Sequence, residues 1–241
     1  MTVTKIDSRQ LHLPPAWMSR VIAGSGAMGN AGEIRKILGE PLPQIVDPKD
    51  VPPEIMAMFT SGGLLERLRK KLSIISRKRG RKILPAKGTI ASVDEQDNLY
   101  VGVDFLEQYG KDEELVAGIL AHEWGHMLSD LPKGIDWSHL NYDELHALRR
   151  DEEADADGFA GRALFLMGCS PDPMIELLKK LDKKKKDAKL PNHKYHNVAT
   201  RNEILRQAWD AEMRAMEVAR KLFFQGKDAS GAKVGRVIGA G

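Results

Sequence analysis

Cysteines and long apolar runs are scarce in this chain. Its 241 residues include one cysteine, Cys169, which excludes a disulfide within the chain and favours a reducing compartment. No apolar run approaches the roughly 18–20 residues that a membrane-spanning helix needs. The N-terminal sequence also lacks the basic start and apolar block of a signal peptide. These absences lead us to expect a cytoplasmic protein without a membrane span.

No strong excess of charge points to a particular partner. The 37 basic and 34 acidic residues leave a net charge of +3. Basic residues concentrate at 67–82, on one face of a helix expected between residues 60 and 79. Such a helix can contact an anionic membrane or a nucleic acid. No aromatic side chains are interleaved with the basic ones, so a solvated face on a core-packed helix is the simpler interpretation.

The most informative stretch is an H-E-x-x-H motif, His122 to His126, inside an apolar run. Positions i and i+4 of a helix lie on one face, so His122 and His126 can point two imidazoles at one metal ion. Glu123 can then reach a water molecule bound to that ion. This arrangement is the zinc-peptidase signature and predicts one zinc ion per chain.

The residues before the motif predict a small set of strands and then a buried helix. Short strands are expected at residues 83–84, 89–93 and 99–103, with a polar turn at 94–98. The motif helix should begin near Lys111 or Asp112, because carboxylates follow in its first turn. Its apolar residues share the histidines' face, so that face should be buried.

A second helix, expected at residues 142–167, carries an acidic cluster that can complete the site. A catalytic zinc needs a third protein ligand besides two histidines. Glu153 is the preferred candidate, because Asp157 then lies one turn further along and can accept a hydrogen bond from a ligand imidazole. The competing ligands on the same helix are Asp151, Glu152 and Asp155.

The rest of the chain predicts a covering segment, further helices and a tail. Residues 1–60, glycine-rich and then proline-rich, are expected to cover the main domain as a lid or propeptide; a glycine-rich phosphate loop is disfavoured. Helices are expected at 173–186, which ends in a solvated lysine run, and from Thr200 to Phe224. The metallopeptidase domain should span 61–226, and residues 227–241 should form a mobile tail.

Two stretches resemble the HtpX and CAAX-prenyl-protease family of gluzincin metallopeptidases. LYVGVDFLEQYGKDEELVAGILAHEWGHML is similar to that family's strand, short helix and active-site helix, and EADADGFA is similar to its E-x-x-A-D-x-x-A third-ligand motif. The similarity covers about residues 83–210. Membrane-bound members have transmembrane helices, so this chain resembles the soluble, minimal gluzincins more.

The resemblance implies an α+β, mostly helical, zincin-like fold, in which a small antiparallel sheet packs on an active-site helix and a glutamate-bearing helix. It implies that an extended peptide lies along an edge strand made of Leu99, Tyr100, Val101, Gly102 and Val103. The family tends to carry a His-Pro segment ahead of an arginine near the site. The nearest equivalent here is His196 ahead of Arg201, without the proline, and these two residues and Tyr195 are candidate donors to the oxyanion.

The expected activity is zinc-dependent endoproteolysis of a protein or peptide substrate, with Glu123 as general base. Two alternatives stay open. One is a cytosolic gluzincin that cleaves a specific repressor-like partner, although such enzymes usually pair the glutamate with asparagine rather than aspartate. The other is a non-catalytic interaction module that keeps the peptidase fold. An intact Glu123 favours an enzyme, because a binding module has no need of a base beside the metal.

Overall fold

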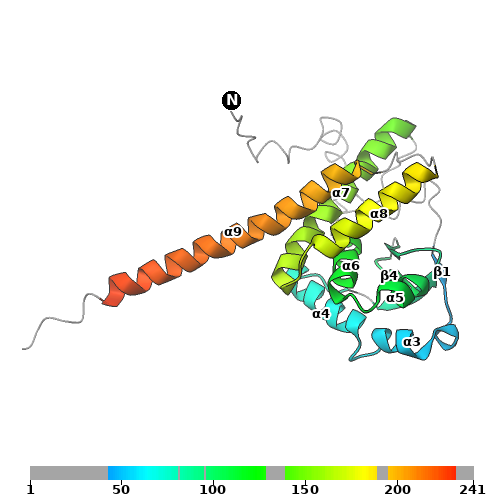
Figure 1. Cartoon of the computed structure of the whole chain (residues 1–241), viewed down its shortest axis with the longest axis horizontal. Coiled ribbons are helices and arrows are strands. Elements are labelled where there is room, and N and C mark those ends of the chain that lie inside the picture. Colours follow the sequence, from blue (N-terminus) through cyan, green and yellow to red (C-terminus); the bar gives the residue numbers. More distant parts are fainter. Residues whose placement is uncertain (1–42, 81, 95, 129–138, 189–194, 232–241) are drawn as a thin grey trace, which may run out of the picture.

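The structure is a computed structural model that describes residues 43–80, 82–94, 96–128, 139–188 and 195–231, with the side chains described as far as Phe224. It is mostly helical, with one small sheet (Figure 1). The helices are α3 (Pro53–Phe59), α4 (Leu64–Ser76), α5 (Val103–Tyr109), α6 (Glu113–Met127), α7 (Tyr142–Met167), α8 (Asp172–Asp187) and α9 (Val198–Gly231), with a 3-10 turn at Pro48–Asp50. The strands are β1 (Gln44–Ile45), β2 (Ile83–Lys87), β3 (Ala91–Val93) and β4 (Leu99–Gly102).

The sheet is mixed rather than antiparallel, with strand order β1-β2-β4-β3. The expected hairpin is present as β3 and β4, and Asp94 closes its turn by accepting hydrogen bonds from the backbone N–H groups of Gln96 and Asn98. β2 lies on the other side of β4 and runs parallel to it. Alternation of side chains predicts strands but not partners, which is why the parallel pairing was missed.

β4 is an interior strand, which corrects the expectation that residues 99–103 form a substrate-binding edge. β2 and β3 flank it on both sides, and all four of its residues are buried. Val103 is the first residue of α5 rather than part of the strand. Because its backbone groups are already paired within the sheet, β4 cannot receive an added strand. Among the described strands, β3 forms the edge on this side of the sheet.

The motif helix α6 forms the centre of the hydrophobic core. Its start is as predicted: Asp112 is the N-cap and accepts a hydrogen bond from the backbone N–H of Leu115. Every residue from Leu115 to Met127 is buried. β3, α4, α7 and α8 all pack against this helix, so it is held on several sides.

α7 lies side by side with α6 and has the bounds that the sequence predicted. Asn141 and Glu144 form a capping box at its start, and Gly168 ends it in the left-handed conformation. The two helices approach closely at Gly125, where an added Cβ would lie 2.7 Å from the Cα of Ala156. Glycine within the motif therefore lets the acidic helix reach the histidines.

The outer helices differ from the expected lengths. α4 begins at Leu64 rather than near residue 60, and Arg77 ends it in the left-handed conformation. α9 packs along α7 with its first half, and Figure 1 shows its second half extending away from the other helices. It continues to Gly231, so residues 227–231 are helical; residues 232–241 of the expected tail lie outside the described residues.

The described part of the N-terminal segment belongs to the body of the protein. Val46, Val51 and Ile55 lie in the same buried core as α6. The proline-rich stretch is compatible with helix after all, since Pro53 occupies the first turn of α3, where no N–H is needed. Residues 1–42, which include the glycine-rich stretch, lie outside the described residues. Within the described part of the chain, no helix is long and apolar enough to cross a membrane.

Candidate metal centre

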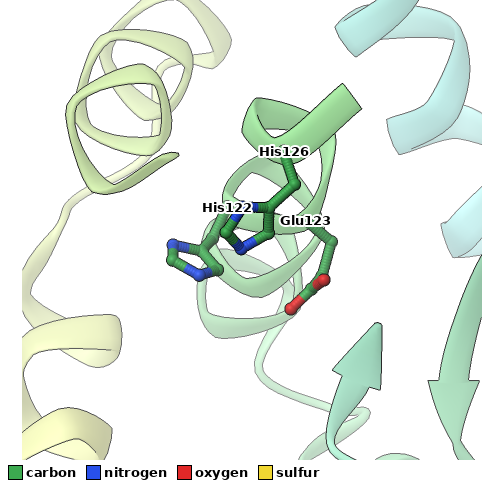
Figure 2. Close-up of side chains that lie close together, drawn as sticks. All are labelled: His122, Glu123 and His126. Carbon is green, nitrogen blue, oxygen red and sulfur yellow. The ribbon is translucent and has the colours of Figure 1, made fainter. Parts of the chain in front are cut away.

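His122, Glu123 and His126 form a compact group on one turn of α6. Each offers a potential ligand atom, and these atoms lie within 4.8 Å of one another. The two imidazole rings are edge to face, with centroids 4.8 Å apart. Figure 2 shows the two imidazoles close together, with the Glu123 carboxylate on the side of α6 nearer the strands. This group could hold a metal ion.

Glu153 reaches the group from α7. Its Oε2 lies 3.2 Å from Nε2 of His122, and its Oε1 lies 3.6 Å from Nε2 of His126. One carboxylate thus faces the same nitrogen of both imidazoles. Two imidazoles and a carboxylate are a donor set that suits zinc and leaves a fourth position for water. The residues present therefore fit the metal that the motif predicts.

The face of α7 on which an acidic residue lies decides whether its carboxylate can reach the two histidines. Glu152, Glu153 and Asp157 are buried, whereas Asp151 and Asp155 are exposed. Of the four ligand alternatives from the sequence, two therefore point to solvent. Glu152 is buried, but its carboxylate contacts Nδ1 of His126, the nitrogen on the far side of the ring from Glu153. This leaves Glu153 as the carboxylate placed between the two Nε2 atoms.

Asp157 contacts the outer nitrogen of His122. Its Oδ1 lies 2.9 Å from Nδ1 of His122. A carboxylate at this place favours the tautomer in which Nδ1 carries the proton, so the Nε2 lone pair is directed toward Glu153. Arg201 donates two hydrogen bonds to the same carboxylate, at 2.7 and 2.8 Å. Although burial would raise the pKa of Asp157, Arg201 and His122 together hold it below its ordinary value.

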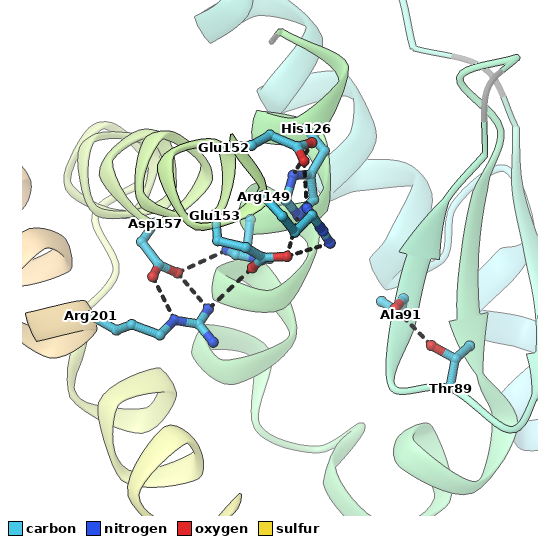
Figure 3. A network of polar contacts seen from close by, with 9 residues as sticks. Thr89, Ala91, His126, Arg149, Glu152, Glu153, Asp157 and Arg201 are labelled. Atoms are coloured by element: carbon cyan, nitrogen blue, oxygen red, sulfur yellow. Dashed lines mark hydrogen bonds and ion pairs between the residues drawn. The ribbon is translucent and has the colours of Figure 1, made fainter. Parts of the chain in front are cut away.

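Glu152 and Arg149 form an equivalent arrangement on His126, which the sequence reasoning did not identify. Glu152 Oε1 lies 3.0 Å from Nδ1 of His126, and its Oε2 accepts a hydrogen bond from Arg149 Nη1 at 2.6 Å. Arg149 also forms an ion pair with Glu153. Figure 3 shows these contacts as one network with those of Asp157 and Arg201. The available signal was the spacing of Arg149, three and four residues before two glutamates.

The electrostatics of the group fit a cation at its centre. Burial would raise the pKa of Glu153, but Arg149 and the two imidazoles hold it well below its ordinary value. Burial would lower the pKa of His122, yet Asp157 and Glu153 raise it to about 9. In the metal-free protein at neutral pH, the His122 ring is therefore a cation with a proton on both nitrogens. Four buried carboxylates, from Glu123, Glu152, Glu153 and Asp157, outnumber the guanidinium groups of Arg149 and Arg201 by two, so with both imidazoles neutral a divalent cation would balance the charge.

The candidate oxyanion donors lie beside this network. Arg201 is engaged with Asp157 and comes within 3.8 Å of Glu153 Oε2. Its guanidinium also lies 4.8 Å from the ring centroid of Tyr195. His196 lines a cavity of about 90 Å³ together with Arg201 and Tyr195. The described contacts include no hydrogen bond or ion pair between His196 and the histidines of α6, so the geometry places Arg201, and not His196, in the network.

Comparison with known proteins adds no identification. No protein-family model matches the chain, and no curated protein sequence is significantly similar to it. The resemblance to the HtpX and CAAX-prenyl-protease family, carried by the H-E-x-x-H and E-x-x-A-D motifs, stays a prediction.

Proposed function

We propose that this chain is a zinc-dependent endopeptidase of gluzincin type. The observation that carries the proposal is the convergence of three potential ligands next to a buried glutamate. Nε2 of His122 and Nε2 of His126 both face the Glu153 carboxylate, and Glu123 follows His122 on the same helix turn. Bound zinc would lower the pKa of its water to about 7 and polarise the carbonyl of the scissile peptide bond.

The protein's own side chains supply the proton transfers and the orientation. Glu123 is 8% exposed and offers a carboxylate oxygen within 4.8 Å of the imidazole nitrogens, so it can take a proton from a water molecule at the metal and pass it to the leaving amine. Asp157 and Glu152 each contact Nδ1 of one imidazole and favour the tautomer that carries its proton there. In the neutral form of each ring the Nε2 lone pair is then directed toward the metal position, and on His122 the metal would displace the Nε2 proton.

The edge strand β3 offers a place for the substrate backbone. Gly102 N–H donates to Ile90 O and Asp94 N–H donates to Asn98 O, so even-numbered residues of this strand pair with β4. By alternation, the backbone N–H of Ala91 points away from β4, while its carbonyl accepts a hydrogen bond from the Thr89 hydroxyl at 2.7 Å. β3 packs against α6. An extended peptide added to this edge would run close to the histidines and would be held mainly by main-chain hydrogen bonds, which place little demand on its sequence.

The decisive experiment compares wild type with Glu123→Gln. We expect both proteins to bind about one zinc ion per chain, because the ligands are unchanged. Hydrolysis of a fluorogenic casein should fall by roughly 10²–10⁴-fold in Glu123→Gln, because the general base is lost. Equal rates for the two proteins would remove Glu123 from the mechanism. Zinc binding without any hydrolysis by wild type would instead favour a binding module.

The third ligand is tested separately. Glu153→Ala removes the carboxylate that faces both Nε2 atoms, so zinc content after dialysis should fall to a small fraction of the wild-type value. Asp155→Ala is the matched control, because Asp155 is exposed on the same helix. That variant should retain zinc. Full zinc content in Glu153→Ala would contradict the ligand assignment.

A further inference from the structure

Arg149 is a fully buried arginine that the proposed reaction does not use. Its side chain is 2% exposed, and it lies on α7 one turn before Glu152 and Glu153. Its Nη1 donates to Glu152 at 2.6 Å, and its Nη2 pairs with Glu153. A guanidinium is planar and presents several donors at fixed angles, so it can hold two neighbouring carboxylates at once.

Each carboxylate that Arg149 holds has a second partner at the candidate metal centre. Glu152 contacts Nδ1 of His126 through its Oε1, and Glu153 faces Nε2 of both imidazoles. The Arg149 guanidinium therefore contacts one potential ligand, Glu153, directly. It acts on a second, His126, through Glu152. Because Arg149 pairs with both Glu152 and Glu153, it also offsets two adjacent, buried negative charges.

The arrangement repeats on the other imidazole. Arg201 holds Asp157, and Asp157 contacts Nδ1 of His122. In both cases an arginine holds a carboxylate that contacts an imidazole, and Figure 3 shows Arg149 with Glu152 and His126, and Arg201 with Asp157. The two arginines come from different helices, α7 and α9, and both come close to the Glu153 carboxylate. Glu153 thus lies between two cations, one on each side.

We propose that Arg149 is a positioning residue of the metal centre: it fixes Glu153 as a ligand and Glu152 as the partner of His126. This inference rests on the proposed function, because it requires the three ligands to bind a metal. It goes beyond that function by assigning a role to Arg149 and Glu152. An ion pair that only supported the fold would not affect metal affinity once the protein is folded.

Zinc affinity is the measurement that separates the two roles. The full chain is stripped of metal, and zinc is titrated in competition with a chromophoric chelator. Arg149→Met should weaken zinc binding by roughly 10–100-fold, the usual effect of removing a partner of a metal ligand. Arg150→Met is the matched control, because the next residue on a helix points about 100° away. Its affinity should stay within about twofold of wild type.

Cobalt substitution gives a second readout that does not depend on activity. Wild type loaded with Co²⁺ should show the intense visible bands of a four-coordinate ion, and in Arg149→Met these bands should weaken or shift as the Glu153 carboxylate moves. If Arg149→Met does not fold without metal, Arg149→Lys serves instead. Lysine keeps the charge but cannot hold both carboxylates in a fixed fork, so zinc should again bind less tightly than in wild type.

The outcomes distinguish this inference from the function on which it rests. If wild type binds no zinc, both fail. If wild type binds about one zinc and a folded Arg149 variant binds it equally tightly with an unchanged cobalt spectrum, only the assignment of Arg149 is overturned. Tighter binding by Arg149→Met would also overturn it, because the guanidinium would then be competing with the metal for Glu153.

Discussion

Arg201 donates to both carboxylate oxygens of Asp157, from Nε at 2.7 Å and from Nη2 at 2.8 Å. The pair joins the first turn of α9 to the middle of α7, 44 residues apart in the chain. Asp157 in turn contacts His122 on α6. Three helices are therefore connected through one carboxylate, and Arg201, one of the candidate oxyanion donors, is engaged with a side chain that contacts His122.

Loss of Arg201 should destabilise the protein. Arg201→Met leaves the buried Asp157 charge without its strongest partner, which typically costs roughly 3–5 kcal/mol. The free energy of unfolding in urea, measured on the metal-free protein, checks this expectation. The double variant Arg201→Met with Asp157→Asn should lose less than the sum of the single losses, since neither charge is then left alone.

The control for this experiment lies on the same helix. Arg206 pairs with Asp172, and the two side chains are 42% and 62% exposed. An exposed pair contributes only about 0–1 kcal/mol, so Arg206→Met should change the free energy of unfolding very little. Similar losses in Arg201→Met and Arg206→Met would show that the buried pair contributes no more than a surface one.

The metal-free protein should lose stability as the pH rises from about 6.5 to about 9. The pKa of His122 is raised from 6.5 to about 9 in the folded state, so the protonated form stabilises the fold. This contribution is complete below the unfolded pKa and is lost as the pH passes the folded pKa. Urea unfolding in a chelator should show a loss on the order of 3 kcal/mol across this range.

Zinc and a substitution provide the checks on this pH dependence. Saturating zinc should flatten the slope, because the metal takes the place of the His122 proton at any pH in this range. Asp157→Asn should also reduce the slope, because it removes the main partner of the imidazolium. A slope that is the same in all three cases would assign the titration to another group.

Blocking the outer edge of β3 at the Ala91 N–H should affect substrate binding without affecting zinc binding. Ala91 presents its backbone N–H to that edge, and Ala91→Pro removes this donor while keeping an extended backbone. Each lost hydrogen bond is worth about 1 kcal/mol, so KM should rise by roughly five- to tenfold. Zinc content should be unchanged. An unaltered KM would place the peptide elsewhere.

The contact between α6 and α7 should be sensitive to a single methyl group. Gly125→Ala adds a Cβ 2.7 Å from Ala156 Cα, which forces the helices apart and should cost roughly 1–3 kcal/mol. Because Glu153 moves with α7, zinc affinity should fall as well. Gly158→Ala is the matched control: among the described residues, its Cβ meets only a side-chain carbon of Ile204, at 3.9 Å. That variant should be neutral or more stable by about 0.5–1 kcal/mol.

Local sequence signals were sufficient to predict the bounds of α6 and α7, the two helices that hold His122, His126 and Glu153. Asp112 predicted the start of α6, and Gly168 predicted the end of α7, because caps act within a few residues of the chain. The hairpin of β3 and β4 followed from its polar turn. The parallel pairing of β2 was not predictable in this way, because strands of similar composition can pair in several orders.

By itself, the sequence determined that two imidazoles and a glutamate share one turn of a buried helix, because helical periodicity places residues four apart on one face. It also narrowed the third ligand to the acidic residues of α7. Only the tertiary structure shows which of them face the histidines, because burial depends on which face of α7 packs against Gly125. It likewise decided that β4 is interior, and that Arg149 and Arg201 each hold a carboxylate that holds an imidazole. Those contacts join side chains from separate helices, and no local pattern specifies the angle at which helices meet.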